Sequence, residues 1–115
     1  MVERREYPRL DDFLSVYYRV LGRDDSPINA LCQNISAGGI CFSAGEGIQQ
    51  ETLLEVGIYI KKINKSIQTK GSVVWSQRRE DKSYPYIVGV KFTEIEDCER
   101  DFILHYVWKV LREKE

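Results

Sequence analysis

The sequence lacks the features of membrane, secreted and nucleic-acid-coating proteins. No apolar run approaches the roughly 20 residues that a membrane-spanning helix needs, and the charged N-terminal residues contain no apolar stretch like that of a secretory signal. The formal net charge is −1 at pH 7, whereas proteins that coat nucleic acid usually carry a clear basic excess. We therefore expect a cytoplasmic protein that neither inserts into a membrane nor binds DNA.

Residues that commonly carry catalysis are scarce as well. His105 is the single histidine, and no pattern of cysteines or carboxylates around it indicates a nucleophile or a metal site. Cys32, Cys41 and Cys98 have no paired spacing, so we expect reduced thiols, the first two of them in the core. No phosphate-binding loop or zinc-protease motif occurs. The sequence therefore predicts a protein that is not an enzyme and that uses no metal or cofactor.

What the sequence does contain is a series of short segments with strand-like alternation. The chain has 115 residues, which fits one domain with a self-supporting core. Six such segments, separated by polar turns, favour an all-β fold that is either a closed antiparallel barrel or a sandwich. The alternating sets are Val16, Tyr18 and Val20; Ile28, Ala30 and Cys32; Ile40 to Ser43; Leu54, Val56, Ile58 and Ile60; Ile67, Thr69, Gly71, Val73 and Trp75; and Tyr86, Val88, Val90 and Phe92.

The two ends of the chain follow different patterns. Residues 1–12 are mostly charged and have no periodicity, which predicts an exposed, flexible arm. Residues 96–115 carry apolar side chains at steps of three and four, which predicts an amphipathic helix that packs on its own barrel. The chain thus divides into an arm (1–12), a barrel (13–95) and a helix (96–115). The helical stripe consists of Cys98, Phe102, Ile103, Tyr106, Val107, Val110 and Leu111.

The arm carries three arginines, Arg4, Arg5 and Arg9, within six residues. Arginines at a terminus are usually solvated. The guanidinium group is nevertheless the side chain best suited to anionic, planar ligands, because its fork binds phosphate and the guanine edge in a bidentate manner. The arm is therefore a candidate for binding a nucleotide.

A polar turn at residues 34–39 is the second candidate. It reads either as a hairpin turn whose glycines supply positive φ, or as a hydrogen-bonding edge for a ligand. In the second interpretation Asn34 offers its amide group and Ser36 its hydroxyl group, while Gly39 permits a close approach to the backbone.

The order and spacing of these motifs resemble those of the PilZ domain family. An RxxxR pair on the arm precedes a [DN]xSxxG turn, a G-x-V-x-W strand and a final barrel strand, after which a helix begins at acidic residues. Each motif is short, but together they cover nearly the whole chain. The matching residues are Arg5, Arg9, Asn34, Ser36, Gly39, Gly71, Val73, Trp75 and 88–92.

The resemblance implies a six-stranded antiparallel β-barrel of the split-barrel type, with one C-terminal helix, that binds the bacterial second messenger cyclic di-GMP. It implies that the arginines hold phosphates and guanine edges and that the turn reads a guanine. At the position of Asn34 the family more often has Asp, and a neutral amide accepts guanine N–H bonds more weakly. The implied ligand-binding residues are Arg4, Arg5, Arg9, Asn34, Ser36, Gly39 and Trp75.

We therefore expect a sensor of cyclic di-GMP whose arm is mobile before binding and clamped afterwards. A downstream protein partner in the control of motility or biofilm formation is expected, with the sensor a monomer or a weak homodimer. Two alternatives stay open. One is a ligand-independent PilZ-like interaction adaptor. The other is an OB-like barrel that stacks single-stranded nucleic acid on its tyrosines.

Overall fold

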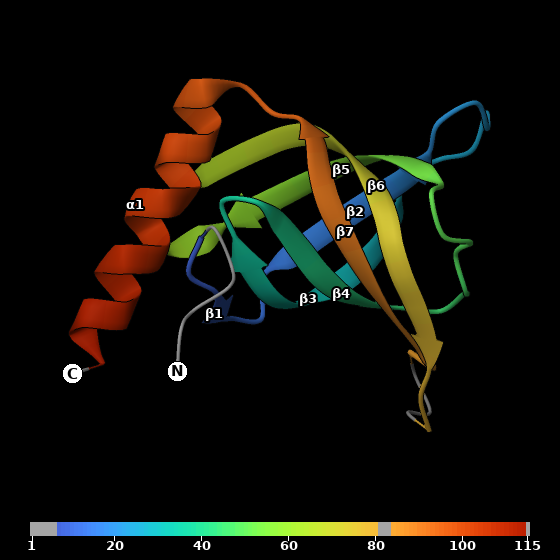
Figure 1. Ribbon diagram of the computed structural model, residues 1–115, viewed down its shortest axis with the longest axis horizontal. Helices are drawn as coiled ribbons and strands as arrows, with labels where there is room; N and C mark the ends of the chain where they lie inside the picture. The colour runs from blue at the N-terminus through green and yellow to red at the C-terminus, as the bar shows by residue number, and fades with distance from the viewer. Residues whose placement is uncertain (1–6, 81–83, 115) are drawn as a thin grey trace.

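Six long antiparallel strands close into a barrel (Figure 1). A computed structural model of the chain describes residues 7–80 and 84–114. The strand order is β3-β2-β5-β6-β7-β4, and pairing between β3 and β4 closes the ring. This architecture confirms the predicted six-stranded barrel with one C-terminal helix. The strands are β2 (Ser15–Val20), β3 (Ile28–Ser36), β4 (Gly39–Ala44), β5 (Leu53–Ile60), β6 (Lys65–Arg78) and β7 (Tyr86–Glu94).

A short additional strand, β1 (Leu10–Asp11), precedes the barrel and pairs with β3. Leu10 is 1% exposed and belongs to the core. The expectation that the exposed arm extends through residue 12 is therefore wrong for Leu10. The reason is energetic, since burying one leucine side chain contributes about 1.5–3 kcal/mol, and charged neighbours on either side do not prevent it.

Helix α1 (Asp97–Glu113) stands beside the end of the barrel where β1 lies (Figure 1). Ile103, Tyr106 and Val107 are buried in the core. The Tyr106 hydroxyl also donates a hydrogen bond to the Asp12 carboxylate. Burial, and then this carboxylate, raise the pKa of Tyr106 above its ordinary value.

The predicted apolar stripe of the helix is wider than the face that the barrel covers. Cys98 is exposed and Phe102 is 37% exposed, so both lie outside the packed face. A short 3₁₀ helix, η1 (Lys61–Ile63), joins β5 to β6. In the part of the chain that the structure describes, no helix has the length and apolar character required to cross a membrane.

Candidate functional site

A pocket of about 310 Å³ on the outside of the barrel brings five of the predicted site residues together. It lies where the β3–β4 hairpin meets β6 and β7, and we call it the arginine pocket. Arg4 and Arg5, the other two predicted residues, lie outside the described residues. The five that line the pocket are Arg9, Asn34, Ser36, Gly39 and Trp75.

The pairing of β1 with β3 explains why Arg9 reaches this pocket. Leu10 pairs with Ile35, and Asp11 pairs with Asn34. Continuing this antiparallel register by one residue places Arg9 at the level of Ser36. The arm is thus joined to the hairpin by backbone pairing directly beside the arginine.

A β-bulge in β3 places Asn34 and Ser36 on the outer face. Cys32 pairs with Phe42 in β4 and Asn34 pairs with Cys41, the residue adjacent to Phe42, so Gln33 is an extra residue in β3. Strict alternation from the buried Cys32 would point Asn34 into the barrel. The bulge shifts the phase, so that Ile35 is buried in the core instead and Asn34 lines the pocket.

A second bulge, in β6, does the same for Trp75. Val73 pairs with Val90 and Trp75 with Gly89, so Val74 is the extra residue. The prediction that Trp75 shares a face with the buried Val73 is therefore wrong, and its side chain is 42% exposed. The indole lies against Gly89, where an added Cβ would come within 2.4 Å of the ring. The neighbouring strand thus leaves room for this tryptophan by having no side chain there.

The hairpin turn is held by Ser36 and covered by Tyr7. The Ser36 hydroxyl oxygen accepts a hydrogen bond from the Gly38 backbone N–H at 3.1 Å. The hydroxyl's own proton is not used in that bond and is available to a ligand. The Tyr7 ring lies over the turn, since a Cβ on Gly38 would be 3.0 Å from its Cδ2.

Gly39 lacks the positive φ that the hairpin-turn interpretation expects of the turn glycines. Among the described glycines only Gly22 has a positive φ, so the expectation that the turn glycines supply one is wrong. A Cβ on Gly39 would lie 2.3 Å from the carbonyl oxygen of Val90. The glycine is needed because β4 and β7 approach each other closely at the base of the pocket.

The arginine pocket is electrostatically positive. Arg9 and Lys91 line it, and none of its described lining residues is Asp or Glu. Neither cation forms an ion pair within residues 7–80 and 84–114. Cys41 also lines the pocket. Burial raises the pKa of its thiol, while Arg9 and Arg79 act to lower it. An anionic ligand would therefore meet positive charge that has no acidic partner among the described residues.

Sequence reasoning missed several lining residues of this pocket. Tyr7 lies inside the RxxxR motif, and Lys91 lies inside the final strand motif. The alternation of Val90 and Phe92 toward the core was a signal that Lys91 points outward. No comparable pattern in the sequence indicates that Cys41 lies beside Asn34 and Trp75.

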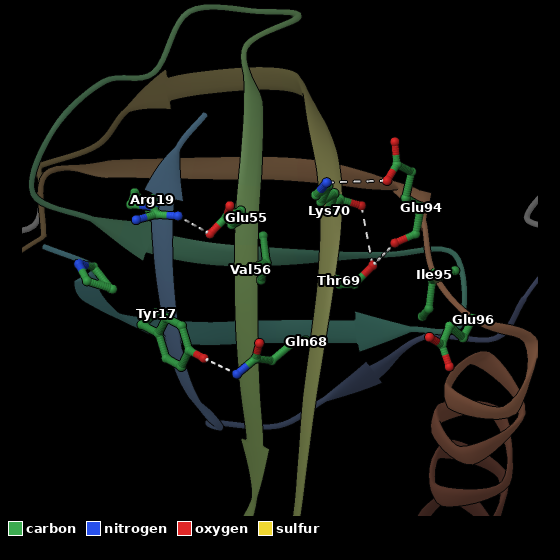
Figure 2. A pocket seen from close by; sticks show the side chains of 11 residues that line it. Tyr17, Arg19, Glu55, Val56, Gln68, Thr69, Lys70, Glu94, Ile95 and Glu96 are labelled. Carbon is green, nitrogen blue, oxygen red and sulfur yellow. Dashed lines mark hydrogen bonds and ion pairs between the residues drawn. The ribbon is translucent and has the colours of Figure 1, made fainter. Parts of the chain in front are cut away.

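A second pocket, of about 710 Å³, lies over the outer face of β2, β5 and β6, and we call it the ion-paired pocket (Figure 2). Figure 2 shows Arg19 pointing toward Glu55, with 2.7 Å between Nη2 and Oε2. Lys70 and Glu94 are 3.5 Å apart. The cations of this pocket are thus already neutralised. No group of side chains suited to holding a metal is found among the described residues.

Comparisons with known proteins identify the relatives of this chain. The family model of the PilZ domain matches residues 3–108. No curated protein sequence matches. Among solved structures, the inhibitor of motility MotI/DgrA of Bacillus subtilis is similar with a TM-score of 0.85 and 26% identity, covering 99% of this chain and 54% of that one. This chain therefore spans about half the length of that relative.

Two further similar structures are complexes with c-di-GMP. The PilZ domain of YcgR from Escherichia coli with c-di-GMP has a TM-score of 0.74 and 13% identity, covering 97% of this chain and 95% of that one. The MrkH–c-di-GMP complex of K. pneumonia has a TM-score of 0.78 and 16% identity, covering 98% and 55% respectively. At these identities the likeness establishes a shared fold.

Proposed function

This chain belongs to the PilZ domain family, and from that premise we propose that it is a receptor module that binds cyclic di-GMP in the arginine pocket. One observation carries the proposal. Arg9, Asn34 and Trp75 lie far apart in the sequence but line one pocket, and its positive charge has no acidic partner among its described lining residues. The ligands named for the similar YcgR and MrkH structures support the same chemistry.

The proposed roles follow from the chemistry of a dianion with two guanine bases. Arg9 and Lys91 bind phosphate, with the guanidinium of Arg9 also able to reach a guanine edge. Asn34 and Ser36 donate to and accept from a guanine. The half-exposed indole of Trp75 offers a face for stacking a purine.

The size of the pocket bears on how the signal is transmitted. Its volume of about 310 Å³ is at the lower end of small-molecule sites, which span about 300–1,000 Å³. A ligand with two bases and two phosphates would remain partly uncovered. In our proposal the arm that carries Arg4 and Arg5 closes over it and forms a new surface for a downstream protein partner. The module would then act as a bacterial, cytoplasmic sensor in motility or biofilm control.

Isothermal titration calorimetry with cyclic di-GMP tests the proposal. We expect saturable binding with a defined stoichiometry, and a much weaker response to GTP, which has guanine and phosphates but not the cyclic dinucleotide. Circular dichroism on the same sample verifies that the barrel is folded. A folded protein that produces no binding heat at high ligand concentration contradicts the proposal.

A further inference from the structure

The outer face of α1 carries aromatic side chains that the barrel covers only in part. Phe102 is 37% exposed and Trp108 is 50% exposed, and the exposed His105 lies between them in sequence. A groove of about 390 Å³ runs along this face beside Ile63 of η1. The Lys65 ammonium group lies 5.1 Å from the centroid of the Phe102 ring.

The same face has a charge pattern that changes sign along the helix. At 100° per residue, Asp101, Phe102, His105, Trp108 and Lys109 fall within about 120° of the helix circumference. Asp97 and Asp101 lie on the N-terminal side of His105, and Lys109 and Arg112 lie on the C-terminal side. Within the described residues none of these four charged groups forms an ion pair.

This pattern is complementary to itself. In an antiparallel pair of helices centred on His105, residues equally far from the centre come to the same level. Asp101 then lies level with Lys109 of the second copy, and Phe102 level with Trp108 of the second copy. A parallel pair would instead place acid beside acid and base beside base, which is unfavourable.

We propose that this face binds the same face of a second copy of this chain, with the helices antiparallel and a two-fold axis near His105. A two-fold interface must be self-complementary, and this face meets that requirement in charge and in its aromatic residues. One helix face buries little area, so the dimer is weak and depends on concentration. The inference is independent of the proposed ligand.

Charge reversal tests the complementarity. Sedimentation equilibrium of the full chain, from micromolar to millimolar concentration, gives the dimer dissociation constant. Each substitution acts twice in a two-fold interface, so Asp101→Lys and Lys109→Asp should each raise that constant at least about tenfold. The double variant should restore it to within about threefold, since the charges are merely exchanged. Asp24→Lys, a reversal on the exposed β2–β3 turn, is the matched control and should change nothing.

Cross-linking tests the orientation. In a Cys98→Ser background, His105→Cys places two thiols beside the axis, and mild oxidation should give a disulfide-linked dimer. The unaltered chain should not cross-link through Cys98, because antiparallel packing separates the two copies of that residue. A dimer linked through Cys98, a monomer at every concentration, or a double variant that fails to recover would each overturn the inference.

Discussion

The ion-paired pocket has more than twice the volume of the arginine pocket, about 710 Å³ against about 310 Å³, yet the smaller pocket is the better site for an anion. In the larger pocket, Arg19 and Lys70 each face a glutamate (Figure 2). In the smaller one, Arg9 and Lys91 face none among its described lining residues. If the proposed function is correct, the balance of charge, more than volume, determines which pocket binds the dianion.

The physical reason is competition. A phosphate that enters the ion-paired pocket must displace a carboxylate from its cation and is repelled by that carboxylate afterwards. In the arginine pocket no described lining residue is a carboxylate that the same phosphate would have to displace. Substitutions that alter one pocket and leave the other intact therefore test the comparison.

The largest effect is expected from Arg9→Ala. Removing this charge-assisted contact costs roughly 1.5–3 kcal/mol, which weakens binding of cyclic di-GMP by about 10- to 100-fold. Arg19→Ala in the ion-paired pocket is the matched control and should leave the affinity unchanged. Calorimetry measures both. Equal losses in the two variants would contradict the assignment of the ligand to the arginine pocket.

Trp75→Ala should have the next largest effect. Stacking of a base on an aromatic ring is worth about 1–3 kcal/mol, and a half-exposed ring belongs in the lower part of that range, which corresponds to about 5- to 30-fold in affinity. Trp108→Ala removes the other tryptophan, which is similarly exposed, at 50% against 42%. The change in tryptophan fluorescence on ligand binding should disappear only in the Trp75 variant. If the change persists in that variant, Trp75 does not contact the ligand.

Asn34→Asp should strengthen binding. A carboxylate accepts guanine N–H groups with the assistance of its charge, which we expect to improve affinity by about 3- to 10-fold. Asn29→Asp, on the same strand but exposed and outside the pocket, adds the same charge and should have little effect. A loss of affinity in the Asn34 variant would show that repulsion from the phosphates outweighs recognition of the base.

The smallest effect is expected from Glu94→Gln, which frees Lys70 in the ion-paired pocket. Exposed ion pairs contribute little, so the affinity for cyclic di-GMP should change less than about twofold. The stoichiometry from calorimetry should also remain the same. A second ligand bound by this variant would show that Glu94 alone prevents the ion-paired pocket from binding the dianion.

Periodicity in the sequence predicted the barrel well because alternation and helical spacing report directly on which side chains are buried. It failed at Trp75, since a bulge adds one residue and reverses every side chain beyond it. Leu10 escaped notice because one apolar residue among charged ones has no period.

The candidate site could be predicted only where its residues belong to one local motif. Asn34 and Ser36 are recognisable from a local motif. The positions of Lys91 and Cys41 depend on the pairing of β4 with β7, and strand register between distant segments cannot be inferred from spacing. Likewise, the purpose of Gly39 became visible only once Val90 was placed opposite it.

The burial of Leu10 lowers the entropic cost of ordering the neighbouring Arg9 when a ligand binds. Arg9 is the residue immediately before this anchored side chain, so its backbone has already lost most of its freedom when the barrel folds. Ordering a free residue costs about 1–2 kcal/mol in conformational entropy. In the proposed complex, that backbone penalty at Arg9 is therefore met before any ligand arrives, and binding has to order mainly its side chain.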